Sequence, residues 1–195
     1  MAGDKDMIKA IIFDCFGVLA ESSYNNFYKT HLPDKPEIVE QIKALDHASN
    51  KGSITHDDFY RGIAELTGMT ELDIREFMKQ HPPNLELFAY IKDELKSKYK
   101  IGFLSNVASD LMDELFTKDQ QALFDDVVLS FQVNLAKPDV EIFELAARRL
   151  GLSLDECIFV DDVQEYLDGA DVAGMKTVLY EDFSSFKEKI RILLG

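Results

Sequence analysis

From residue 85 onward, segments with helical spacing alternate with short apolar segments, and this order limits the fold more than any other feature. Each of four apolar, strand-like segments follows a segment whose apolar residues recur every three or four positions; the four are 100–104, 126–130, 157–160 and 177–180. The longest helical pattern opens at Lys137 and Pro138 and closes at Gly151. Parallel strands need right-handed helical crossovers, so this order predicts a Rossmann-like α/β fold: a parallel sheet with helices on both faces.

The apolar segment 8–13 predicts a further buried strand, which ends at Asp14 and is followed by Gly17. Ligands of open α/β sheets lie at the carboxyl ends of the strands. Asp14 is therefore either a residue that caps the next turn or a nucleophile or metal ligand. On its own, the segment favours the capping role.

Residues 20–84 show helical spacing without strand-like segments. Thr55 is expected to begin a helix that ends at Gly68. We therefore predict a Rossmann-like core of residues 1–19 and 85–195, with a small helical cap of residues 20–84 inserted after the first strand. The four histidines of the chain lie in this insertion, and we expect them on its solvated surface or in its turns: His31, His47, His56 and His81.

Composition excludes several classes of partner. The chain has 21 Lys and Arg residues against 36 Asp and Glu residues, a formal net charge of −15, which repels nucleic acids and anionic membranes. One small anionic substrate can still be held locally. Cys15 and Cys157 lie in apolar segments typical of buried thiols, and residues 1–6 do not resemble the start of a leader peptide. We expect a soluble, cytoplasmic protein, and its oligomeric state stays open.

Polar residues follow the predicted strands, and they are the candidates for chemistry. The carboxyl ends of parallel strands meet at one edge of a sheet, so these side chains are expected to share a small volume. Three carboxylates there need compensation, which a divalent cation and a lysine supply. A carboxylate, a cation, a hydroxyl and a lysine are the equipment of phosphoryl transfer. The candidates are Asp14, Ser105, Asn106, Lys137, Asp161 and Asp162.

Four short motifs at these positions resemble those of the haloacid dehalogenase-like hydrolase superfamily. They are Asp14-x-Phe16-Gly17-Val18, Leu104-Ser105-Asn106, Ala136-Lys137-Pro138-Asp139 and Phe159-Val160-Asp161-Asp162. The chain is similar to the helical-cap subgroup, which includes the phosphatase domain of soluble epoxide hydrolases and bacterial sugar-phosphate phosphatases. The resemblance covers residues 1–19 and 85–195, whereas residues 20–84 match only in position and helical character.

The resemblance implies a role for each polar residue that meets the substrate. Asp14 corresponds to the nucleophile, which forms an aspartyl-phosphate, or an alkyl ester in dehalogenases. Ser105 implies a hydrogen bond to a phosphate oxygen, and Asn106 implies a supporting polar contact. Lys137 implies neutralisation of the charge on the nucleophile and on the phosphate.

The resemblance also implies a Mg²⁺ site. Asp14 and Asp162 correspond to metal ligands, together with the backbone carbonyl of Phe16. Asp161 implies a direct or an indirect contact with the ion. The substrate implied is a small phosphorylated or otherwise anionic molecule.

Phe16 departs from the family pattern of the phosphatases. Those enzymes carry at this position a second Asp, which protonates the leaving group and then activates water. The leading hypothesis is a Mg²⁺-dependent phosphatase that acts through an aspartyl-phosphate without this acid. A 2-haloacid dehalogenase is the first alternative, because such enzymes carry an aromatic residue here. Against it, the arginines available to hold a halide in the insertion are few, Arg61 and Arg75. The second alternative is a catalytically impaired phosphate-binding or regulatory protein.

Overall fold

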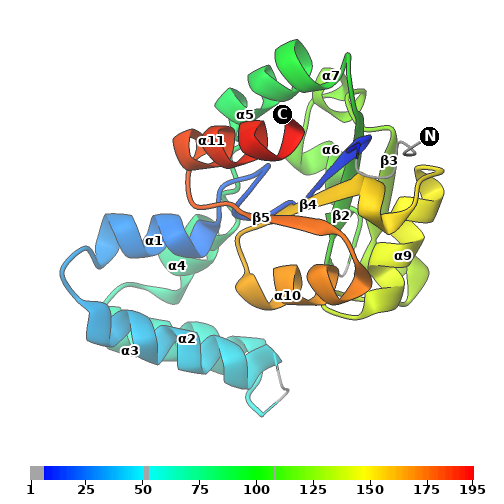
Figure 1. The fold of residues 1–195 in the computed structure, drawn as a ribbon. Coiled ribbons are helices and arrows are strands. Elements are labelled where there is room, and N and C mark those ends of the chain that lie inside the picture. Colours follow the sequence, from blue (N-terminus) through cyan, green and yellow to red (C-terminus); the bar gives the residue numbers. More distant parts are fainter. Residues whose placement is uncertain (1–6, 51–52, 108) are drawn as a thin grey trace, which may run out of the picture. The chain divides into compact units, whose positions relative to one another are not determined.

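The computed structural model describes residues 7–50, 53–107 and 109–195 of the chain (Figure 1). The chain forms two compact units. The core unit consists of Met1–Ala20 and Pro82–Gly195, and the helical unit consists of Glu21–His81. That the helical unit acts as a cap over the site stays a prediction.

The core unit contains, among the described residues, five strands that form one parallel sheet. The strands are β1 (Ala10–Phe13), β2 (Lys100–Ser105), β3 (Asp126–Leu129), β4 (Cys157–Asp161) and β5 (Lys176–Leu179). Their order across the sheet is β3-β2-β1-β4-β5, so β1 lies in the middle. The helices of this unit are α5 (Leu85–Tyr90), η1 (Ile91–Leu95), α6 (Met112–Leu115), α7 (Lys118–Gln121), α8 (Ser130–Val133), α9 (Val140–Arg149), η2 (Leu154–Glu156), α10 (Gln164–Ala173) and α11 (Phe183–Leu194).

Both faces of the sheet are buried by helices, which explains why its strands are apolar on both sides. Ile11 and Phe13 of β1 pack in the cluster that also holds residues of α5 and α11. Ala10 and Ile12 pack in a second cluster, with residues of α9 and α10. Side chains alternate between the faces of a strand, so the two clusters are the two faces of the sheet. Figure 1 shows α5 and α11 on the side of the sheet opposite to α9 and α10. The predicted Rossmann-like α/β architecture is thereby confirmed.

The C-terminal helix α11 was not predicted from the sequence. Asp182 is its N-cap and accepts a hydrogen bond from the backbone N–H of Ser185. Phe186 and Ile190, four residues apart, are fully buried against the sheet. These features are ordinary helix indicators, a cap followed by apolar residues at helical spacing.

Two other helices differ from the prediction. The helical spacing of residues 111–116, which precedes the predicted strand 126–130, gives only a single turn, α6, because Thr117 forms a capping box with Gln120 and starts a new helix, α7. The long helix expected to open at Lys137 begins only at Val140, after the N-cap Asp139. Lys137 therefore lies in the loop before α9.

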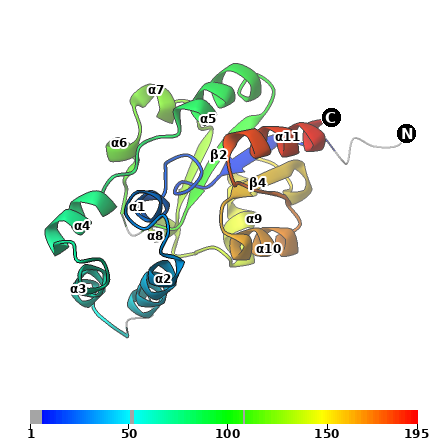
Figure 2. The ribbon, with the colours of Figure 1, turned by 90° about the vertical axis from the view of Figure 1, so that its left-hand side faces the viewer.

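The helical unit contains α1 (Ser23–His31), α2 (Pro36–Asn50), α3 (His56–Thr67) and α4 (Glu71–Met78), and α2 and α3 run beside each other (Figure 2). Thr55 caps α3 by accepting a hydrogen bond from the N–H of Asp58, and Gly68 ends it with a φ of 74°. Both ends match the prediction. The apolar interior of the unit includes Phe27, Ile42, Phe59, Ile63 and Ile74.

His31, predicted on the solvated surface or in a turn, is half-buried at the C-terminal end of α1. Its ring packs between Phe27 and Phe77, with centroid distances of 5.0 Å to each, and its Nε2 atom is buried without a hydrogen-bond partner among the described residues. The side chain of His47 lies outside the described part of the chain. Residues 1–6, which we expected not to form a leader peptide, also lie outside it. No helix within the described residues is long and apolar enough to cross a membrane.

Candidate active site

The predicted site residues come from the carboxyl ends of three adjacent strands and one loop, all in the core unit. Asp14 directly follows β1, the central strand. Ser105 is the last residue of β2, and Asp161 is the last residue of β4. Both strands pair with β1, so the three ends lie next to one another. Lys137 enters from the loop between α8 and α9.

The Lys137 ammonium joins two of the carboxylates. Its Nζ atom lies 2.7 Å from Oδ1 of Asp14 and 2.6 Å from Oδ2 of Asp161. Relative exposure is 3% for Lys137, 5% for Asp14 and 0% for Asp161. Buried charges need close partners because removal from water is strongly unfavourable. Lys137 is therefore held as the counter-ion of both carboxylates.

The loop that carries Lys137 is fixed by Asn106. The side-chain oxygen of Asn106 accepts a hydrogen bond from the N–H of Lys137, and its amide nitrogen donates to the Lys137 carbonyl, both at 2.9 Å. The side chain thus forms a two-point clamp on the backbone of the loop. Asn106 was expected to provide a supporting polar contact, and the support it provides is to Lys137.

Gly17 allows the third carboxylate to approach. A Cβ atom at this position would lie 2.1 Å from Oδ2 of Asp162, and the backbone φ is +86°. Only glycine adopts this conformation readily and leaves the space that the carboxylate fills. Asp162 is thereby brought to Asp14 and Asp161, and one oxygen from each of the three carboxylates lies within 4.8 Å of the others.

Burial and mutual repulsion shift the acidities of the cluster. Burial, with the nearby Asp14 charge as a second cause, raises the pKa of Asp161 to about 7 although Lys137 opposes the shift. The same two causes raise the pKa of Asp162 to about 6. Burial disfavours the Lys137 ammonium, but the Asp14 and Asp161 carboxylates outweigh this and raise its pKa above the ordinary value. The cluster thus has an excess of negative charge that one lysine does not balance.

Ser105 and Phe16 complete the set of predicted residues. Ser105 is 1% exposed and is the last residue of β2, where it pairs with Leu129 of β3. Phe16 is half-buried and packs against the apolar cluster on the α5 and α11 face of the sheet. An aromatic ring, not a carboxyl group, therefore occupies the position two residues after Asp14.

Sequence reasoning missed Tyr166, which also contacts this cluster. The Nζ atom of Lys137 lies 4.6 Å from the centroid of the Tyr166 ring. Tyr166 lies in the first turn of α10, four residues after Asp162. This turn follows β4, so Tyr166 lies close in the sequence to the predicted ligand Asp162. That short spacing is the sequence feature that could have indicated a role for Tyr166.

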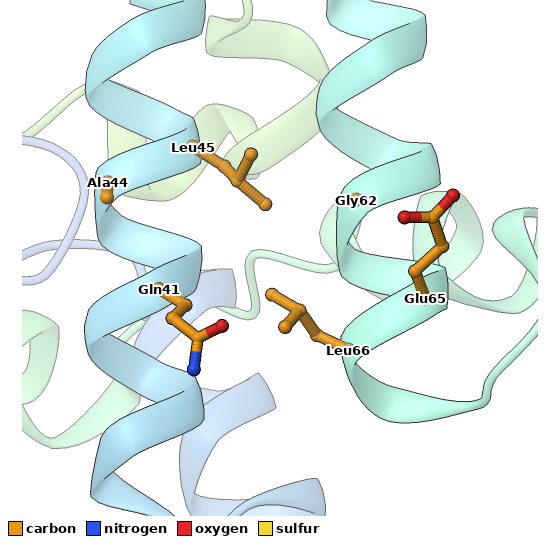
Figure 3. Close-up of a pocket in the computed structure, with 6 residues that line it drawn as sticks. All are labelled: Gln41, Ala44, Leu45, Gly62, Glu65 and Leu66. Atoms are coloured by element: carbon orange, nitrogen blue, oxygen red, sulfur yellow. The ribbon is translucent and has the colours of Figure 1, made fainter.

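A cavity of about 460 Å³ lies elsewhere, between α2 and α3 of the helical unit (Figure 3). Leu45 and Leu66 point into it, and Gln41 and Glu65 flank them. It shares no residue with the carboxylate cluster, so it is not the site described above.

A family model described as haloacid dehalogenase-like hydrolase matches residues 8–174, which include every residue of the cluster. The chain belongs to the haloacid dehalogenase-like hydrolase family. It is therefore a hydrolase, and the predicted family resemblance is confirmed.

Several named relatives of this hydrolase are phosphatases. The glyceraldehyde 3-phosphate phosphatase of Methanopyrus kandleri is 25% identical over 88% of the chain and 83% of the relative. The D-ribitol-5-phosphate phosphatase of Bacteroides thetaiotaomicron is 24% identical over 97% of the chain and 100% of the relative. A family enzyme of the same organism, solved in complex with magnesium and inorganic phosphate, is 27% identical with a TM-score of 0.55, covering 91% of the chain and 98% of that structure.

The raised pKa values predict an unusual pH dependence of stability for the metal-free hydrolase. The pKa of Asp161 is raised from the ordinary 3.8 to about 7, and the pKa of Asp162 is raised from 3.8 to about 6. At pH values between the unfolded and the folded pKa values, the folded state binds more protons than the unfolded state. The free energy of unfolding therefore falls as the pH rises. We expect a fall of ~2 kcal/mol or more between about pH 5 and about pH 7.5, because one pKa unit corresponds to ~1.4 kcal/mol.

Urea unfolding in the presence of a chelator measures this slope. Asp162→Asn is expected to reduce it, because the variant removes one of the two titrations. Burial also raises the pKa of Asp126, outside the cluster, so Asp126→Asn is the matched variant and should leave most of the slope in place. Stability that rises over this pH range in the native protein would contradict the prediction.

Proposed function

We propose that this hydrolase is a Mg²⁺-dependent phosphatase that acts on a small phosphorylated metabolite through an aspartyl-phosphate on Asp14. One observation carries the proposal: the Lys137 ammonium bridges Asp14 and Asp161 in a buried cluster that Asp162 completes. Relatives named as sugar-phosphate phosphatases support it. The buried thiols of Cys15 and Cys157 are compatible with a reducing compartment, and we propose the cytoplasm.

The donor atoms of the cluster fit Mg²⁺. This ion prefers carboxylate, carbonyl and water oxygens, and it usually keeps several waters. Asp14 and Asp162, with the carbonyl of Phe16, are the proposed ligands, and Asp161 is a less direct one. Three carboxylates against a single buried lysine leave negative charge for a divalent cation to balance. When bound, Mg²⁺ neutralises phosphate oxygens and so lowers the barrier to attack by an anion.

The residues of the chain divide the proposed reaction between them. An oxygen of Asp14 attacks phosphorus, the bond from phosphorus to the ester oxygen breaks, and the leaving oxygen takes a proton from solvent. Water then attacks the phosphorus of the aspartyl-phosphate, which releases inorganic phosphate and restores the carboxylate. Lys137 balances the charge of Asp14 and of the phosphate, and Ser105 donates a hydrogen bond to a phosphate oxygen.

Removal of Mg²⁺ is the direct test of this function. Across a panel of phosphorylated metabolites, phosphate release by the full-length protein is expected to require Mg²⁺ and to fall at least ~10²-fold in a chelator. Restoring Mg²⁺ should restore the rate, which separates loss of the ion from loss of the fold.

Other outcomes of the same panel identify the alternatives. Chloride release from 2-haloacids without any metal would indicate a dehalogenase. Binding of inorganic phosphate without turnover of any substrate would indicate a phosphate-binding or regulatory protein.

A further inference from the structure

The Lys137 ammonium has two aromatic neighbours besides its two carboxylates. Its Nζ atom lies 4.6 Å from the centroid of the Tyr166 ring and 5.3 Å from that of Phe159. Both distances are within the range at which a cation is attracted to an aromatic face. A lysine ammonium has three N–H donors, and the Asp14 and Asp161 carboxylates account for two of them.

The position of Tyr166 is determined by the turn that also holds Asp161. The N–H of Val163 donates to Oδ1 of Asp161 at 2.8 Å, and the N–H of Tyr166 donates to the Val163 carbonyl at 3.1 Å. These two bonds connect the end of β4 to the first turn of α10. The ring is therefore presented to Lys137 by the same backbone that carries the carboxylate.

The Tyr166 side chain makes no other ion pair, hydrogen bond or ring contact among the described residues, apart from apolar packing on the α9 and α10 face. Tyr166 therefore acts on the site through the face of its ring, and its hydroxyl is not required for this contact. Lysine is a mobile point charge on a flexible stem. A ring beside the ammonium limits where that charge moves and shields one side of it from water.

We propose that Tyr166 is a positioning residue of the phosphate site: its ring face holds the Lys137 ammonium in the orientation in which it meets the phosphate. The inference rests on the proposed function, because it assigns Lys137 to the phosphate. It requires the aromatic ring, so phenylalanine can replace tyrosine and leucine cannot.

The test is titration calorimetry of the full-length protein with inorganic phosphate in the presence of Mg²⁺. Tyr166→Leu is expected to weaken phosphate binding ~5- to 30-fold, whereas Tyr166→Phe stays within ~2-fold of the native protein. Affinity for Mg²⁺ alone should change less than ~2-fold in both variants. Should Tyr166→Leu fail to fold, Tyr166→Met fills a similar volume without a ring and is expected to show the same loss.

Tyr90→Leu is the matched control. Tyr90 is a half-buried tyrosine of the core unit, with Nζ of Lys187 5.3 Å from its ring centroid, and it packs against Phe183 and Phe186. The control thus removes a ring and a lysine contact outside the carboxylate cluster, and phosphate affinity should not change.

Two results would overturn the inference: native phosphate affinity in Tyr166→Leu, or a loss in Tyr166→Phe as large as in Tyr166→Leu. Lys137→Met separates this failure from that of the proposed function. If Lys137→Met weakens phosphate binding while Tyr166→Leu does not, only the role of Tyr166 is wrong. If Lys137→Met leaves phosphate binding unchanged, the proposed phosphate site is wrong as well.

Discussion

Replacing Asp14 with Asn is expected to reduce turnover by at least ~10³-fold, because the amide has the shape of the carboxylate but cannot form the aspartyl-phosphate. Loss of the nucleophile removes the first chemical step and not substrate binding. Initial rates with the best substrate of the phosphate panel measure the effect. Trapping of labelled phosphate on the native protein, and not on Asp14→Asn, identifies the attacking group.

The variant should remain folded, since Asn still accepts a hydrogen bond from Lys137 and Asp161 remains as the second partner of the ammonium. Asp168→Asn makes the same chemical change at an exposed position of α10, and its rate should match that of the native protein. Substantial turnover by Asp14→Asn would show that another residue is the nucleophile.

The sequence allowed the carboxylate cluster to be predicted because its positions are dictated by the sheet. An apolar strand that ends in a polar residue places that residue at the sheet's carboxyl edge. Asp14 and Asp161 needed no further information, since both directly follow or end buried strands. The bridge by Lys137 could be predicted only as a need for positive charge, not as a pair of contacts.

Contacts that depend on side-chain direction could not be predicted in this way. The Asp162 carboxylate can approach Gly17 closely because Gly17 has a positive φ and no Cβ atom. A periodic sequence pattern encodes neither of these properties. The ring of Tyr166 lies beside Lys137 because α10 starts with a particular turn after β4. Helical spacing alone predicts for such a tyrosine only a place in the core.

In the helical unit, the ends of a helix could be predicted from the sequence, but a contact between two helices could not. Its helix ends could be predicted from Thr55 and Gly68, since caps are local. The packing of the His31 ring between Phe27 and Phe77 joins α1 to α4, and neither helix pattern by itself predicts a contact between these distant segments.

Phe16 leads to the second large effect, a strong dependence of the rate on the leaving group. No carboxylic acid at this position can protonate the departing oxygen, and a general acid typically contributes ~10²–10⁴ in rate. Aryl and acyl phosphates, whose oxygens leave readily as anions, should therefore be hydrolysed much faster than alkyl phosphates. The missing base should also slow attack of water on the aspartyl-phosphate, so a burst is expected before a slow steady state.

Phe16→Asp should accelerate hydrolysis of alkyl phosphates by up to ~10²-fold and flatten the dependence on leaving-group pKa. Phe16→Asn is the matched control, since it has the same size as Asp but cannot transfer a proton, and its dependence should stay steep. A rate series against leaving-group pKa for the three proteins measures the effect.

Two outcomes would contradict the prediction. If the rate of the native protein does not depend on leaving-group pKa, another residue already supplies the proton. If Phe16→Asn gains as much rate as Phe16→Asp, removal of the ring, rather than proton transfer, raises the rate.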